Sequence, residues 1–343
     1  MSNSDVKKGS ITIKDIALLA NVSQSTVSKA LNDRPDVNTD TREHIKKIAE
    51  KHNFRPNVFG KALKSQTTES IGVLICREIL PPSDNPFYSR VMEGIEAELA
   101  VKNYSMTLDI VNGRDKNAVP KVIRERRVDG MILMGVFDKQ YIDMIMQYDI
   151  PVAFIDPKIT LDAYDQVLID NEHGAQLAVD YLISLGHKHI GFVSGSLNRS
   201  SFQQRYVGYR DTLAYHNLPL KPEWVQAGGL EEGYNQIKSI IELESRPTAI
   251  FCANDINAIK GYRAIHERGL NIPGDISIVG FDDIEFGKHS NPALTSVRVY
   301  KEELGSIAVR GLFKRFKDTS RGPTTTVVPV KLIIRDSAAS PAG

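Results

Sequence analysis

The chain of 343 residues is 41% hydrophobic and 25% charged, with a formal net charge of +1, which is the composition of a globular protein with room for two or three domains. Only two cysteines occur, Cys76 and Cys252, and each lies in an apolar run, so we expect buried thiols and exclude a disulfide framework. The first ten residues hold no apolar stretch and no run is long enough to span a bilayer, so we expect a cytoplasmic protein.

Charge is distributed unevenly along the chain. Residues 1–64 contain 12 Lys and Arg against 7 Asp and Glu, a local charge of +5, and the remainder carries −4. A basic amino-terminal module on a mildly acidic body is the pattern expected of a DNA-binding head attached to a sensing domain.

Two short helices separated by a turn are predicted between Thr12 and Asn32. Helical spacing gives each an apolar side, formed by Ile13, Ile16, Ala17 and Ala20 on the first and by Val27, Ala30 and Leu31 on the second. Thr12 followed three residues later by Asp15 fits an N-cap with an acidic partner, and Ser23 can cap the second helix. The two helices therefore share one small core.

The outward face of the second helix carries hydrogen-bonding side chains of modest length, namely Gln24, Ser25, Ser28, Lys29 and Asn32, and Thr26 is a further candidate DNA contact. An ordinary solvated helix more often shows Glu/Lys pairs there. This difference favours a helix-turn-helix unit, whose second helix reads a major groove, over a plain helical hairpin. We expect Gln24, Ser25 and Ser28 to reach base edges and Lys29 to reach phosphate or base, with Thr12 as a further DNA contact.

A third helix is predicted to start near Asn38 or Thr39 and to close a three-helix head with an inward face of Ile45, Ile48 and Ala49 and with Phe54. The segment 57–64, NVFGKALK, predicts a further short helix. Eight residues are marginal as a helix in water, and Gly60 weakens this one further. We therefore expect the segment to be helical only when something packs against it.

From Ser70 onward, apolar runs of strand length alternate with amphipathic helical stretches. The runs are SIGVLIC, MTLDIV, DGMILMG, PVAFID, HIGFVSG, TAIFCA and SIVGFDD. Strands that are apolar on both faces and alternate with helices predict an α/β fold of parallel sheets covered by helices. Seven or more strands over about 270 residues fit two sheets better than one.

Side chains suited to a binding site follow several of these runs. Ligands of parallel α/β lobes bind beyond the carboxyl ends of the strands. The chain places there Phe87, Tyr88, Phe137, Asp156, Arg199, Arg205, Asn254, Asp255, Asp282 and Asp283. Carboxylates, an amide, guanidinium groups and an aromatic ring together suit a sugar. Asp255 and Asp283 fit helix N-caps or turn positions equally well, and Arg199 and Asp156 also fit a salt bridge at the rim.

Several of these segments together resemble the LacI/GalR family of transcriptional regulators. Similarity is carried by TIKDIALLANVSQSTVSKALN, DVNTDTREHIKKIAEKHNFRPN, NPFYSRVMEGIE, SLGHKHIGFVSG and SIVGFDD, and it extends from about Ile11 to Arg335. The resemblance implies a helix-turn-helix head at 1–56, a hinge helix and linker at 57–69, a periplasmic-binding-protein-like core of two lobes at 70–336 and a tail at 337–343. It places the first lobe at about 70–169 and 295–325, and the second at about 170–290 and 326–336.

The resemblance also implies roles for particular residues. The hinge helix would pair with its dimer mate in the minor groove, where Leu63 would wedge between base pairs beside the further DNA contacts Asn57, Lys61 and Lys64. Arg205 and Asp282 match residues that commonly bind the effector in sugar-responsive members, while Asn254 and Phe87 match a polar and an aromatic contact. The implied protein is a homodimeric repressor of carbohydrate-utilisation genes that reads a near-palindromic operator, binds a small sugar-like effector and needs no cofactor or metal.

Other function classes fit the sequence less well. No Walker A loop, G-x-S-x-G elbow or H-E-x-x-H motif occurs, and His187 and His189 come without a third metal ligand, so we expect no enzyme and expect these histidines to interact with a helix C-terminus. A secreted binding protein is disfavoured by the DNA-binding head. Control by a phosphorylated protein partner or by a purine-type effector remains open.

Overall fold

The computed structural model describes residues 11–31, 33–52, 54, 67–76, 86–111, 119–158, 161–229 and 232–341. The chain divides into two compact units, Met1–Thr68 and Glu69–Gly343. Most of the predicted hinge segment lies outside the described residues, as do the candidate DNA contacts Asn32, Asn57, Lys61, Leu63 and Lys64. Within the described ranges, no helix is long and apolar enough to cross a membrane.

The described part of the first unit is a three-helix head, as predicted, formed by α1 (Ile13–Leu19), α2 (Gln24–Leu31) and α3 (Thr39–Lys51). Its core contains the fully buried side chains of Ile16, Val27 and Ile45, one from each helix, with Phe54 packed against them. Since the core is this small, each of these side chains provides a large share of the apolar surface that the head buries.

Local polar contacts start each helix of the head. Thr12 and Asp15 form a complete capping box at α1, and the Ser23 hydroxyl accepts from the Thr26 amide at 3.0 Å to cap α2, so both predicted caps are confirmed. Asn21 adopts a left-handed conformation in the turn between α1 and α2, which asparagine tolerates better than most residues. These caps and this turn fix the angle at which α2 leaves α1.

The second unit contains two six-stranded sheets, which confirms the predicted α/β fold with two sheets. The first sheet has the order β11-β5-β4-β3-β1-β2 and all of its strand pairs are parallel. Its strands are β1 (Ser70–Cys76), β2 (Ser105–Val111), β3 (Gly130–Met134), β4 (Val152–Ile155), β5 (Asp165–Ile169) and β11 (Thr325–Val328).

The second sheet has the order β12-β10-β9-β8-β6-β7, in which only the edge strand β12 runs antiparallel to its neighbour. Its strands are β6 (Ile190–Gly195), β7 (Val225–Gly228), β8 (Ala249–Cys252), β9 (Ser277–Asp282), β10 (Thr295–Val299) and β12 (Val330–Ile333). Cys76 on β1 and Cys252 on β8 are buried free thiols, as predicted.

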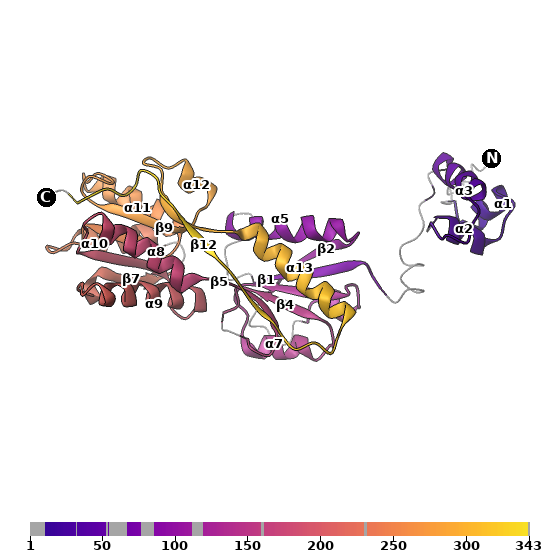
Figure 1. The fold of residues 1–343 in the computed structure, drawn as a ribbon, viewed down its shortest axis with the longest axis horizontal. Coiled ribbons are helices and arrows are strands. Elements are labelled where there is room, and N and C mark those ends of the chain that lie inside the picture. The colour runs from indigo at the N-terminus through magenta and orange to yellow at the C-terminus, as the bar shows by residue number, and fades with distance from the viewer. Residues whose placement is uncertain are drawn as a thin grey trace, which may run out of the picture. The chain divides into compact units, whose positions relative to one another are not determined.

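Helices cover these sheets and define two lobes (Figure 1). The first lobe carries α5 (Pro86–Val101), α6 (Lys121–Arg124), α7 (Lys139–Met146) and α13 (Lys301–Lys317). The second carries α8 (Asn171–Ser184), α9 (Ser200–Tyr215), the short 3-10 helix η1 (Pro222–Trp224), α10 (Gly233–Ile241), α11 (Asp255–Glu267) and α12 (Glu285–Lys288). Gly94 and Gly305 let α5 and α13 approach closely, because a Cβ atom at either position would collide with backbone of the other helix.

The chain passes between the lobes three times, from β5 to α8, from β10 to α13 and from β11 to β12 (Figure 1). The predicted lobe boundaries are wrong at two of these passages. Residues 295–299 were expected in the first lobe but pair with β9 in the second sheet, and 326–328 were expected in the second lobe but pair with β5 in the first. Both boundaries came from the resemblance, and the composition of these two strands does not reveal which sheet each one joins.

Two residues of the predicted tail at 337–343, Ser337 and Ala339, contact the second lobe. Ser337 is fully buried and donates to the Ile278 carbonyl at 2.6 Å. The buried His187 ring lies 2.9 Å from the Ala339 carbonyl and 2.8 Å from the Thr248 hydroxyl, and the His189 ring packs on Trp224. The predicted interaction of these two rings with a helix C-terminus is therefore wrong.

Candidate ligand cleft and nucleic-acid interface

A cleft between the two lobes is lined from both sides at the carboxyl ends of the strands. The first lobe supplies Phe87 and Tyr88 near the start of α5 and Asp156 after β4, and the second supplies Arg199, Ser201, Phe202, Arg205, Asn254, Ile256, Asp282 and Ile284. With Asp255 and Asp283 set aside as possible cap or turn residues, seven of the eight remaining predicted contacts meet in one place. In this conformation the cleft holds about 40 Å³ of free volume, room for a few water molecules at most.

Phe137 is the predicted contact that does not belong to the cleft lining. Its side chain is buried in the hydrophobic cluster on the other face of the first sheet and stacks on Tyr141 with ring centroids 5.6 Å apart. A phenyl ring has no polar group to satisfy, so Phe137 is stable in this hydrophobic cluster. It contributes to the packing of the first lobe and does not stack on a ligand.

Arg205, on α9, is the most tightly held polar group in the cleft. The residue is 3% exposed, and its guanidinium donates to the Asn171 side chain at 2.9 Å, to the Ala253 carbonyl at 2.5 Å and to the Asp282 carboxylate at 3.3 Å. The guanidinium also lies over the Phe281 ring, 3.7 Å from its centroid. A planar donor fixed in this way is preorganised to bind an oxygen of a ligand.

Arg199 connects the two lobes across the cleft. Its guanidinium donates to the Tyr88 hydroxyl at 3.2 Å and lies 3.7 Å from the Asp156 carboxylate, and both partners belong to the first lobe. A backbone hydrogen bond from Ser200 to Lys158, 3.0 Å long, joins the lobes beside this pair. Arg199 and Asp156 therefore form the salt bridge that was the alternative to a ligand contact, and both residues also line the cleft.

The carboxylates of the cleft are buried and their backbones are strained. Desolvation raises the pKa of Asp156 and of Asp282, while Arg199 and Arg205 respectively act most strongly in the opposite direction. Both residues have positive φ, +47° at Asp156 and +108° at Asp282, a conformation that residues other than glycine rarely adopt. Strain of this kind at the ends of two strands from different lobes is typical of a functional site.

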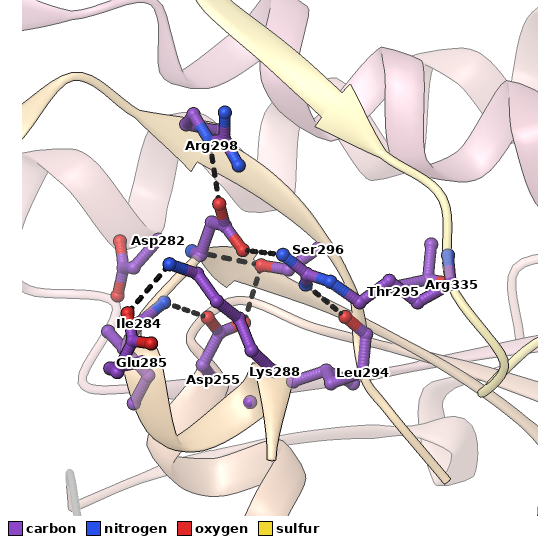
Figure 2. A network of polar contacts seen from close by, with 12 residues as sticks. Asp255, Asp282, Ile284, Glu285, Lys288, Leu294, Thr295, Ser296, Arg298 and Arg335 are labelled. Atoms are coloured by element: carbon purple, nitrogen blue, oxygen red, sulfur yellow. Dashed lines mark hydrogen bonds and ion pairs between the residues drawn. The ribbon is translucent and has the colours of Figure 1, made fainter. Parts of the chain in front are cut away.

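Asn254, rather than Asp255, is the N-cap of α11. The Asn254 side-chain oxygen accepts from the Asn257 amide at 2.7 Å, which fixes this residue at the cleft wall. Asp255 and Asp283 lie behind the wall, where Asp255 bonds to the Ile284 amide and to Ser296, and Asp283 pairs with Arg298 and Arg335 (Figure 2). Neither carboxylate lines the cleft.

Four lining residues escaped prediction, namely Ser201, Phe202, Ile256 and Ile284. Helical spacing could have indicated Ser201 and Phe202, because they precede Arg205 by four and three positions and so share its face of α9. Ile256 and Ile284 each follow a predicted contact by two residues, and they add apolar surface to the cleft. In the described part of the chain, no group of three His, Cys, Asp or Glu side chains is arranged to hold a metal ion.

The predicted DNA-contacting face of the head is exposed where it is described. Gln24, Ser25 and Lys29 are exposed on α2, while Thr26 and Ser28 are half-buried. Lys29 forms an exposed ion pair of 2.6 Å with Asp36, and the Thr12 hydroxyl is engaged in its capping box. A solvent-exposed ion pair of this kind is weak, so it leaves the Lys29 ammonium available to a phosphate.

The comparisons with known proteins agree with this arrangement. A model of bacterial regulatory proteins of the lacI family matches residues 12–57, and a model of the periplasmic binding protein-like domain matches residues 179–338. The ribose operon repressor of Haemophilus influenzae is 33% identical over 330 residues, which cover 95% of this chain and 98% of that protein. The chain belongs to the LacI family of bacterial regulatory proteins.

Two further similarities place the regulator within that family. The HTH-type transcriptional repressor PurR of Photorhabdus laumondii subsp. laumondii is 34% identical over 333 residues, covering 95% of this chain and 96% of that protein. The structure of the lac repressor dimer bound to operator and the anti-inducer ONPF matches with a TM-score of 0.85 and 26% identity, over 96% of this chain and 100% of that one. The regulator is thus a DNA-binding transcriptional regulator with a helix-turn-helix head and a ligand-binding core.

Proposed function

We propose that the regulator represses carbohydrate-utilisation genes and that a small sugar-like effector, bound in the interlobe cleft, controls its affinity for operator DNA. The supporting observation is that Arg205, Asn254 and Asp282 meet in a cleft lined from both lobes. We further propose that it acts in the cytoplasm as a homodimer without enzymatic activity. A twofold dimer presents identical recognition helices to two half-sites, which suits a near-palindromic operator.

The cleft chemistry favours a sugar because it offers donors, acceptors and ring faces together. Sugar hydroxyl groups both donate and accept, which matches guanidinium groups at Arg199 and Arg205 and carboxylates at Asp156 and Asp282. Phe87 and Phe202 supply apolar ring surface for the C–H face of a sugar. The two arginines balance the two aspartates in charge, so the site suits a neutral polyhydroxy ligand.

Effector binding would change how the lobes are arranged. The cleft holds about 40 Å³ of free volume, and Arg199 joins the lobes across it through Tyr88 and Asp156, so we expect a bound sugar to separate these contacts or to displace lining side chains. Movement of the lobes would then shift the two hinge helices of the dimer relative to each other. Gln24, Ser25 and Ser28 would read base edges, with Thr12, Thr26, Lys29 and Asn32 as supporting contacts and the hinge contacts Asn57, Lys61, Leu63 and Lys64 in the minor groove.

A thermal-shift screen tests the effector proposal. The full-length regulator is heated with each of a panel of neutral sugars, sugar acids, sugar phosphates and purines. A compound present at about 100 times its dissociation constant stabilises the unit that binds it by about 2.7 kcal/mol, which raises the melting temperature measurably. We expect a neutral sugar to do so.

Two variants of α9 show whether the effect arises in the cleft. Arg205→Ala removes the central donor and should abolish the shift, whereas Arg210→Ala is the matched control, since Arg210 is exposed and pairs with Asp211 on the same helix. If only a purine raised the melting temperature, the proposed effector would be a planar base and not a sugar. No shift across the whole panel would contradict the small-effector proposal and favour control by a protein partner.

A further inference from the structure

Lys301 is a buried lysine whose ammonium group donates its hydrogen bonds to carbonyl oxygens of the main chain. It is the first residue of α13, and its side chain is 6% exposed. The ammonium donates to the carbonyl oxygens of Asp282, Asp283 and Val299, so each of its three N–H groups has an acceptor. Burial lowers the pKa of this lysine, and the carboxylate of Asp282 is the strongest opposing influence. An apolar side chain would fill this space without that desolvation cost, so the charge calls for an explanation.

Two of the three carbonyls that Lys301 binds belong to the strained turn at the end of β9. Asp282 and Asp283 both have positive φ, +108° and +50°, in succession. Two adjacent residues other than glycine in this conformation cost free energy that the surrounding contacts must offset. This turn directs the Asp282 carboxylate to Arg205, while its two carbonyls point the other way, to Lys301.

Other contacts hold the same turn from behind the cleft wall (Figure 2). Asp255 accepts from the Ile284 amide at 2.8 Å and from the Ser296 hydroxyl at 2.6 Å, and that hydroxyl accepts from the Asp283 amide at 3.0 Å. These bonds fix the amide groups of the turn, whereas Lys301 fixes its carbonyl groups. The peptide units on either side of Asp283 are therefore held at both ends, at the N–H by Ser296 or Asp255 and at the carbonyl by Lys301.

Lys301 also lies where the chain leaves the second lobe for the first. Val299 ends β10 in the second sheet, and α13 packs on α5, β4 and β5 of the first lobe. The ammonium thus joins the turn that carries Asp282 to the start of the helix that carries the chain across. Ser296 and Arg298 tie the turn to β10 itself, whereas Lys301 ties it to the first residue of α13.

We infer that Lys301 is a positioning residue of the effector cleft: it holds the Asp282–Asp283 turn so that the Asp282 carboxylate meets Arg205, and it links that carboxylate to the β10–α13 passage between the lobes. The role of Asp282 as an effector contact rests on the proposed function, but its placement against Arg205 does not. The inference can therefore be tested in the ligand-free regulator.

The test measures how readily phenylglyoxal, a reagent for guanidinium groups, labels Arg205 in the full-length protein, with the labelled residue quantified by mass spectrometry. The Asp282→Ala variant gives the reference rate, the rate at which Arg205 is labelled when its carboxylate partner is absent. Lys301→Met should raise the rate by about tenfold, the factor expected when a hydrogen bond to a charged group no longer holds the turn. Lys288→Met is the matched control, because Lys288 lies nearby on α12 and is partly exposed, pairing with Glu285 (Figure 2).

The double variant Lys301→Met/Asp282→Ala separates positioning from general packing. If Lys301 acts through Asp282, the double variant labels no faster than Asp282→Ala alone. An unchanged rate in Lys301→Met, or additive rates in the double variant, would overturn the inference. Circular dichroism and Trp224 fluorescence check the fold, and Lys301→Gln, which keeps hydrogen-bond donors but no charge, is the second variant. Global unfolding of both single variants at Lys301 would also overturn it, since the role would then be structural.

Discussion

Replacing Asp255 by asparagine should change how the stability of the regulator depends on pH. The Asp255 carboxyl is 0% exposed, and both of its oxygens accept from neutral donors, the Ile284 amide and the Ser296 hydroxyl. Burial raises its pKa to about 8, and the nearby Asp282 and Asp283 carboxylates act in the same direction. In the unfolded chain the pKa of Asp255 should lie near 3.8, the ordinary value for an aspartate, so the folded state binds more protons between these two pKa values.

The sign and the size follow from proton linkage. Since the folded pKa is the higher one, the contribution of this group to stability is complete below about pH 4 and falls as the pH rises towards 8. The slope is at most about 1.4 kcal/mol per pH unit, and it flattens above the folded pKa. Between pH 6 and pH 9 the wild-type protein should therefore lose about 2 to 3 kcal/mol that Asp255→Asn does not lose.

Urea denaturation at four pH values between 6 and 9 measures this difference. The only tryptophan, Trp224, is fully buried in the second lobe, so its fluorescence reports the lobe that contains Asp255. Asparagine also loses a hydrogen bond, because its NH₂ group faces a donor, but that loss of about 1 to 3 kcal/mol does not vary with pH. Asp211→Asn is the exposed control. Parallel curves for wild type and Asp255→Asn would refute the reasoning.

Two further substitutions test the division of the chain and the assignment of Phe137. Ile45→Ala leaves a cavity in the small hydrophobic core of the head and should lower the stability of the head by about 2 to 5 kcal/mol. Operator binding should then be lost, while urea unfolding of the second unit, followed by Trp224 fluorescence, stays unchanged. Loss of both together would contradict the division into two units. Phe137→Ala should lower the free energy of unfolding of the first lobe by about 3 to 5 kcal/mol, measured by calorimetry. Effector affinity, measured by isothermal titration, should stay within about twofold. A large loss of affinity would show that Phe137 contacts the effector after all.

Much of the fold follows from local sequence patterns. All seven apolar runs form strands, and six of them are buried, as expected where a parallel strand needs apolar side chains on both faces; the seventh, β2, is a partly exposed edge strand. β5 was missed because it begins with two buried polar residues, Asp165 and Gln166. Their partners are Arg315, at 2.6 Å from Asp165, and Thr325, at 3.0 Å from Gln166, which lie about 150 positions further along the chain. No local pattern reveals a partner at that distance.

The cleft was predictable to the extent that strand ends meet at one edge of a sheet. This rule brought Asp156, Asn254 and Asp282 together, but it does not tell which face of the sheet a side chain such as Phe137 joins. Lys301 escaped prediction for a different reason. Its partners are backbone carbonyls, which every residue possesses, so its role follows only from the conformation of the turn that it binds.

The most direct test of the account is the affinity of the full-length regulator for operator DNA with and without the sugar identified by the thermal-shift screen. The operator is first selected from random duplex DNA, and binding is then followed by fluorescence anisotropy at 0.15 M salt, about physiological ionic strength. The account predicts a near-palindromic site and a change in affinity of about tenfold or more at saturating sugar, which is absent in Arg205→Ala. An operator affinity that saturating sugar leaves unchanged in the wild-type protein would contradict it.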